Sequence, residues 1–119
     1  MIQKINLKGK FQLFSDYWHP RIIGQVNDTH IKLARLKGRF EWHHHDTEDE
    51  MFLVIQGNLA IELEDGVIAL SEGETVVIPR GVEHCPVAAE EALVMLIEPA
   101  STVNTGNIKS EKTVDAQWI

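Results

Sequence analysis

Residues 38–57 read GRFEWHHHDTEDEMFLVIQG, and this stretch decides the fold of the chain. His43 and His45 are two positions apart, and alternate residues of a β-strand point to the same face. The four polar residues that follow predict a turn, and the apolar run 51–55 predicts a second strand that begins at Glu50. The pattern therefore places two imidazoles and one carboxylate on facing strands.

A donor set of two imidazoles and a carboxylate suits a borderline divalent ion. Fe, Mn, Ni, Zn, Co and Cu accept such ligands, whereas Mg and Ca prefer oxygen throughout. The alternative is that three consecutive histidines lie in a solvated loop among acidic residues. A second element favours the metal site: residues 73–84 read GETVVIPRGVEH, a turn, a short apolar strand and a Pro-x-Gly turn before a histidine. His84 is therefore a fourth candidate ligand.

Together the two elements resemble the motifs of the cupin superfamily. The first cupin motif is a glycine, five residues, His-x-His, three or four residues, Glu, six residues and Gly, matched here by Gly38, His43, His45, Glu50 and Gly57. The second is Gly, five residues, Pro-x-Gly, two residues, His, three residues and Asn, matched here by Gly73, Pro79, Gly81 and His84. Gly38 is one residue too close to His43, and Ala88 replaces the Asn. The resemblance implies that the metal ligands are His43, His45, Glu50 and His84.

The fold class expected is all-β. Many short strands with regular turn signals predict a sandwich or barrel, and the resemblance narrows this to a jelly-roll (cupin) β-barrel, or double-stranded β-helix, with a short N-terminal lead-in. A chain of 119 residues predicts one domain. We expect a lead-in over residues 1–20, a barrel core over about 21–99 and a tail over 100–119.

Alternating patterns predict where the strands lie. We expect strands over residues 22–26, 30–37, 39–45, 50–56, 59–64, 67–70, 75–78, 84–88 and 92–98. A short helix or turn is expected in the lead-in, and one short ordered segment near Ile108 in the tail. If His43 and His45 face inward, strand alternation predicts that Phe40, Trp42 and His44 face outward.

Composition excludes several classes of partner and site. The chain has 18 acidic and 11 basic residues and a net charge of -7, without a basic stripe, so we expect no nucleic acid partner. The single cysteine, Cys85, forms no internal disulfide and is expected to be a small buried side chain in a reducing compartment. The chain shows no signal peptide and no apolar run that would span a membrane, so we expect a cytoplasmic protein.

The apolar runs 51–55 and 92–97 are apolar on both faces. Such strands need cover on both sides, from a terminal segment or from another subunit. We therefore predict a homodimer.

The expected site suggests a function. Three neutral histidines and one glutamate leave a divalent centre with net charge near +1, which attracts anionic oxygen donors. We expect a metal-dependent enzyme of isomerase, lyase or dioxygenase type acting on a small polar or anionic organic substrate, with Glu50 doubling as a catalytic base. Arg39 and Glu41 alternate with His43 and His45 along the predicted strand, so they share its face. They either reach the cavity or lie in water at its mouth.

The alternatives come from other classes of protein. The chain also resembles cupins known as mannose-6-phosphate isomerase-like, but a phosphosugar site needs more cations than Arg80 and Arg39. A non-catalytic metal-containing binding or sensor protein for small molecules stays open, as does a barrel whose histidines are structural. The occurrence of all four ligand types argues against the last of these.

Overall fold

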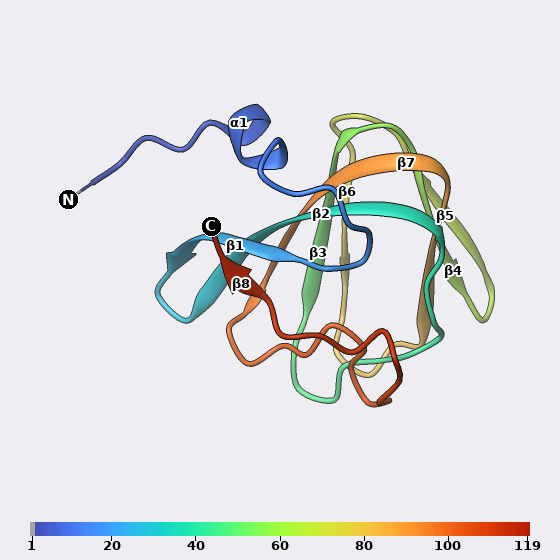
Figure 1. Cartoon of the computed structure of the whole chain (residues 1–119). Coiled ribbons are helices and arrows are strands. Elements are labelled where there is room, and N and C mark those ends of the chain that lie inside the picture. The colour runs from blue at the N-terminus through green and yellow to red at the C-terminus, as the bar shows by residue number, and fades with distance from the viewer. Residues whose placement is uncertain (1) are drawn as a thin grey trace.

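The structure is a computed structural model that describes residues 2–119, and it confirms the predicted jelly-roll β-barrel (Figure 1). One short helix precedes eight strands. In chain order these are α1 (Leu7–Phe11), β1 (Arg21–Val26), β2 (Thr29–Arg39), β3 (Glu50–Gln56), β4 (Leu59–Leu63), β5 (Gly66–Leu70), β6 (Thr75–Ile78), β7 (His84–Pro99) and β8 (Gln117–Trp118).

Strand β7 connects the two sides of the barrel. Its first residues pair with β4, its last residues pair with β3, and β2 runs antiparallel beside it along both halves. Beyond these strands, β5 pairs with β4, and β6 pairs with β3. On the other side, β1 pairs with β2, and β8 pairs with β1. The two strands predicted at 84–88 and 92–98 are thus one strand of 16 residues. The sequence pattern is interrupted between these two predicted strands because the pairing of β7 with β2 shifts there. Leu36 pairs with Ala92, but Gly38 pairs with Ala88.

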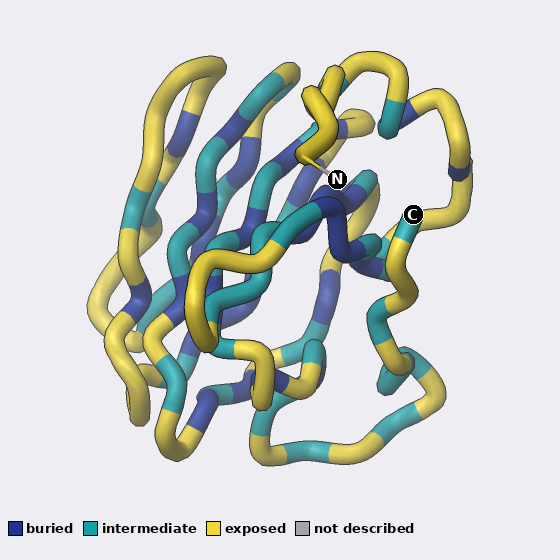
Figure 2. The backbone as a smooth tube through the Cα atoms, turned by 90° about the vertical axis from the view of Figure 1, so that its left-hand side faces the viewer, coloured by how far each residue is buried: buried dark blue, intermediate teal, exposed yellow. Residues whose placement is uncertain are grey.

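The core lies between the two sides of the barrel. Its buried members alternate along β2, β3, β4 and β7, and Figure 2 shows these dark segments inside the strands. They include Phe52, Val54, Ile61 and Val94, which are almost fully buried. Burying apolar side chains yields about 25 cal/mol per Å². This layer therefore supplies the stability that fixes the strand register.

A second cluster covers the outer face of β2, β3 and β7. Phe11 from α1 and Phe14 pack with Ile23 and Leu33, and Leu93 and Met95 lie partly buried against them. The N-terminal lead-in therefore provides one of the two kinds of cover expected for strands that are apolar on both faces. The cover is incomplete, since Met51, Leu53 and Ile97 stay partly exposed.

One sequence prediction of local structure is wrong, and one element was missed. Residues 40–49 form a loop whose one strand-like contact is the isolated bridge between His43 and His84, so no strand spans 39–45. The tail has a hydrogen-bonded turn that ends at Ile108, near the expected ordered segment, and also β8, which pairs in parallel with β1 and was not predicted. Both depend on pairing with distant parts of the chain, which local patterns do not encode.

No helix in residues 2–119 could span a membrane.

The approach of the β3–β4 turn to β7 gives a first prediction. Gly57 has φ +91°, and a Cβ there would lie 2.8 Å from the Glu91 carbonyl oxygen, whereas Gly73, with φ +81°, has open space around it. We predict that Gly73→Ala lowers the free energy of unfolding by about 1–2 kcal/mol, from backbone strain alone. Gly57→Ala should cost about 1–3 kcal/mol more, because backbone must move. Urea denaturation of both variants measures the difference, and equal losses would contradict it.

Candidate metal centre

A pair of backbone hydrogen bonds brings the two motifs together. The His43 N–H donates to the His84 carbonyl at 3.0 Å, and the His84 N–H donates to the His43 carbonyl at 2.9 Å. The Gly81 N–H also donates to the His45 carbonyl at 2.8 Å. The loop that carries His43 and His45 is therefore fixed against the start of β7, although it is not itself a strand.

Four side chains predicted as ligands converge at this junction. One donor atom from each of His43, His45, Glu50 and His84 lies within 4.8 Å of the others, and all four residues are buried. Glu50 Oε1 is 3.5 Å from both His45 Nε2 and His84 Nε2. These separations are long for direct hydrogen bonds but suit atoms that share a central ion at about 2.0–2.2 Å.

The hydrogen bonds on the far side of two rings orient the donor atoms. His43 Nδ1 donates to the Glu41 carbonyl and His84 Nδ1 to the Val82 carbonyl, both at 2.8 Å. A carbonyl oxygen only accepts, so each Nδ1 carries the proton and each Nε2 keeps its lone pair. Metal-binding histidines are oriented in this way in proteins.

The converging atoms lack partners of their own. Within residues 2–119, His45 Nε2, His84 Nε2 and Glu50 Oε1 are buried and make no hydrogen bond. Leaving such a group unsatisfied costs about 1–3 kcal/mol. Three of these atoms aimed at one point fit a divalent ion, and the nitrogen-rich donor set favours Mn, Fe, Co, Ni, Cu or Zn.

The protonation states also suit metal binding. Burial lowers the pKa of His43 to about 4, so its imidazole is neutral at pH 7. Burial opposes ionisation of Glu50, but the facing imidazoles of His45 and His84 outweigh it and hold the pKa of Glu50 below its ordinary value. Glu50 is thus the one carboxylate of the set. A divalent ion bound here would leave a net charge of +1 at the centre.

The C-terminal tail closes over the outside of this loop. The His44 N–H donates to Asn107 Oδ1 and the Asn107 N–H donates to the His44 carbonyl, both at 2.8 Å. Gly106 makes this approach possible, because a Cβ at its position would collide with the His44 carbonyl. The His44 ring points away from the centre and binds Glu83 and Asp46, as its predicted outward direction requires.

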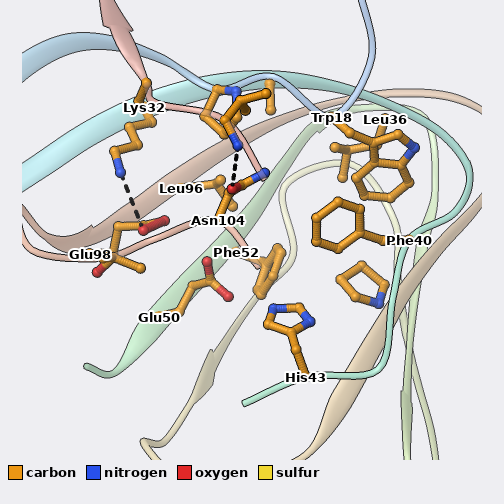
Figure 3. Close-up of a pocket in the computed structure, with 16 residues that line it drawn as sticks. Trp18, Lys32, Leu36, Phe40, His43, Glu50, Phe52, Leu96, Glu98 and Asn104 are labelled. Atoms are coloured by element: carbon orange, nitrogen blue, oxygen red, sulfur yellow. Dashed lines mark hydrogen bonds and ion pairs between the residues drawn. The ribbon is translucent and has the colours of Figure 1, made fainter. Parts of the chain in front are cut away.

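A cavity opens beside the four residues (Figure 3). His43 and Glu50 line it, and Trp18, Phe40 and Phe52 form its aromatic wall. The prediction that Phe40 faces outward is therefore wrong. Phe40 is the first residue of the loop, so strand alternation does not apply to it, and it stacks on Trp18 with ring centroids 4.7 Å apart. About 50 Å³ of the cavity is open to water, which is room for about four water molecules.

Two charged residues of the cavity were not identified as site residues from the sequence. Lys32 is 4% exposed, and Glu98 is 3% exposed. Lys32, Ala34 and Leu36 are alternate residues of β2 and point to the same inner face, as do Leu96 and Glu98 of β7. This alternation with buried apolar residues was the signal available in the sequence.

Other sequence candidates lie elsewhere. Arg39 binds Glu62 through two hydrogen bonds of 2.7 and 2.8 Å, and Arg80 lies 3.5 Å from Asp49 at the surface. Glu41 contributes its carbonyl to His43. His30 lies on an outer hollow of about 260 Å³, lined by Ile22, His30, Lys32 and residues 100–103 and 114–116.

Cys85 is fully buried, as expected, and burial raises the pKa of its thiol.

Comparison with known proteins gives consistent matches. Residues 33–98 match the family described as the cupin domain. The uncharacterized protein YdbB of Bacillus subtilis is 40% identical over 63 residues, which span 52% of this chain and 56% of that protein's own length. A cupin-2 domain-containing protein of Shewanella frigidimarina superposes with a TM-score of 0.79 at 48% identity, covering 80% of this chain and 93% of that chain. Protein NMB1881 of Neisseria meningitidis gives a TM-score of 0.75 at 32% identity over 82% of this chain and 99% of that chain.

We predict that His45→Ala and His84→Ala each abolish stoichiometric metal binding. Loss of a direct ligand should lower metal affinity by more than the 10- to 100-fold that loss of a supporting residue costs. His44→Ala is the matched control, because its ring lies outside the cluster and the backbone bonds to Asn107 do not need it. Mass spectrometry of tagless protein purified without chelator measures metal per chain. Equal metal in His84→Ala and the wild-type protein would contradict the site.

Proposed function

Because this chain belongs to the cupin domain family, we propose that it is a metal-dependent cupin acting on a small polar or anionic organic molecule. The observation that supports this most directly is the group of three buried, unpartnered donor atoms on His45, Glu50 and His84 beside a cavity. A purely structural cluster would leave these atoms unsatisfied at a cost in stability. The reaction types proposed are isomerisation, elimination or oxygenation.

A divalent ion held by these residues would supply Lewis acidity and open coordination positions. The chain itself supplies orientation. The Glu41 and Val82 carbonyls hold two imidazoles in the binding tautomer, and Trp18, Phe40 and Phe52 give the cavity an apolar wall. Of the two roles expected for Glu50 we propose that of ligand, because its Oε1 is buried and lies 3.5 Å from both His45 Nε2 and His84 Nε2.

The size of the cavity limits the substrate. A water-accessible volume of about 50 Å³ favours a compact molecule over a sugar phosphate. Two cations that a phosphosugar site would use are also engaged elsewhere, Arg39 by Glu62 and Arg80 by Asp49, which leaves Lys32 as the cation of the cavity. We therefore do not extend the mannose-6-phosphate isomerase-like designation to the chemistry of this protein, and propose a smaller substrate.

We predict metal-dependent turnover of a compact substrate. Protein loaded in turn with Fe, Mn, Co, Ni, Cu and Zn would be incubated with small hydroxy acids, oxo acids and diketones. Product is followed by mass spectrometry and oxygen uptake by electrode. His84→Ala treated identically is the control for reactions of free metal. Turnover that is equal in His84→Ala contradicts a metal-dependent enzyme, and ligand-induced thermal stabilisation without product supports the binding or sensor alternative.

We also propose that the protein is a homodimer. Met51, Leu53 and Ile97 form a partly exposed apolar strip on the outer face of β3 and β7. Figure 1 shows the N-terminal arm running away from the barrel, and Ile2 is fully exposed. We propose that this arm packs on a second copy.

Light scattering coupled to size exclusion should therefore give twice the 13.5 kDa chain mass at micromolar concentration. Leu53→Glu should weaken the dimer by placing charge in the strip, whereas Val67→Glu, on exposed β5, should not. A monomeric wild-type protein would contradict this proposal.

A further inference from the structure

Lys32 and Glu98 form a buried charged pair in the cavity, outside the proposed ligand set. Lys32 Nζ lies 3.4 Å from Glu98 Oε2, and both side chains are at most 5% exposed. The two residues come from neighbouring strands, β2 and β7. Figure 3 shows them on the side of the cavity opposite Trp18 and Phe40.

A structural ion pair explains this arrangement poorly. A buried pair recovers the cost of desolvation only with good geometry and with its remaining hydrogen-bonding groups satisfied. The distance of 3.4 Å is long, and within the described chain Glu98 is the one hydrogen-bond partner of Lys32 Nζ. An ammonium group has three N–H donors, so Lys32 retains donors for a molecule in the cavity.

The charge of the cavity favours an anion once a metal is bound. A divalent ion, the Glu50 carboxylate and the Lys32 ammonium sum to +2. Burial and the adjacent Glu50 raise the pKa of Glu98, while Lys32 opposes that rise. With Glu98 ionised or neutral, the sum is +1 or +2, so the conclusion does not depend on its protonation. Such a cavity attracts a carboxylate rather than a neutral molecule.

The position of Lys32 relates the inner cavity to the outer hollow. Lys32, Thr102, Val114 and Ala116 line both spaces. Lys32 therefore lies between the enclosed space and the larger space, on the side closed by the C-terminal tail. Its side chain belongs to the same cavity lining as the candidate metal ligands His43 and Glu50.

We propose that Lys32 is the anion-binding residue of the cavity, and that the molecule bound is a small organic acid whose apolar part packs on Phe40 and Phe52. Glu98 is the residue that positions the ammonium group. This inference rests on the proposed function for its metal, and it adds the carboxylate and the residue that recognises it. The aromatic wall and the small free volume restrict the acid to a compact one.

The test compares acids with their neutral isosteres. Acetate, propionate and pyruvate, with acetamide and propionamide, are titrated into metal-loaded full-length protein by calorimetry. Lys32→Met removes the charge at similar length, and Lys32→Met/Glu98→Gln avoids leaving a buried carboxylate unpaired if the single variant folds poorly. Lys37→Met, at an exposed lysine of the same strand, is the matched control. Metal content is measured for every variant.

We expect at least one acid to bind tighter than its amide, and both Lys32 variants to weaken that acid about 10- to 100-fold with metal content unchanged. Lys37→Met should bind as the wild-type protein does. Equal binding of acid and amide, or unchanged acid affinity in the double variant, overturns the inference and leaves the metal site standing. If the wild-type protein takes up no metal, the proposed function fails. The same titrations on metal-free protein then decide the role of Lys32: a preference for acid that disappears in the Lys32 variants supports it, and no preference overturns it.

Discussion

The two backbone hydrogen bonds between His43 and His84 are the constraint on which the site depends. They join a loop that has no other strand pairing to the first residue of β7, and they bring the two imidazole rings to a centroid distance of 4.4 Å. β7 is in turn held by β2, β3 and β4, so the position of His84 is set by much of the barrel. The loop is therefore held in place by backbone hydrogen bonds to the sheet, although it is not a strand of the sheet. A catalytic or binding group placed in this way is held by backbone geometry, and its side chain is free to face the cavity.

The cluster that results is unfavourable without an ion. Three buried donor atoms lack partners, and Glu50 lies beside a second carboxylate, Glu98, that is also removed from water. Each unsatisfied group costs about 1–3 kcal/mol, so the fold carries this cost only because the apolar layer built on Phe52, Val54 and Val94 is well packed. Local violations of the rules of polar satisfaction are expected where a protein binds something. The location of these violations is therefore evidence for function that is independent of any family resemblance.

The sequence motifs selected four residues that the structure brings together, but not the shape of the pocket. His43, His45, Glu50 and His84 could be chosen because residue spacing and turn signals act over a few residues, although the strand expected to carry His43 and His45 is a loop. Phe40 was misplaced because the strand β2 ends at Arg39, so alternation does not continue through the loop. Lys32 was not identified because a charged residue between apolar ones usually marks the exposed face of a strand. Its alternation with Ala34 and Leu36 was a local signal, but its pairing with Glu98, which is 66 residues away, is contained in no local pattern. The pairing of β8 with β1 was missed for the same reason.

The polar residues of the interior share one end of the barrel. Met51 pairs with Ile97, so Glu50 and Glu98, one residue beyond each, are neighbours across β3 and β7 at the ends of those strands. Further along, the inward positions become apolar, as at Phe52 paired with Leu96 and Val54 paired with Val94. The end with the carboxylates is also where the loop 40–49 and the C-terminal tail meet through His44 and Asn107. The polar and apolar side chains of the interior therefore lie in different parts of the barrel. The apolar part stabilises the fold, and the charged part faces the segments that border the outer hollow. The cavity thus has a charged side and an aromatic side, the arrangement that suits an anion with an apolar part.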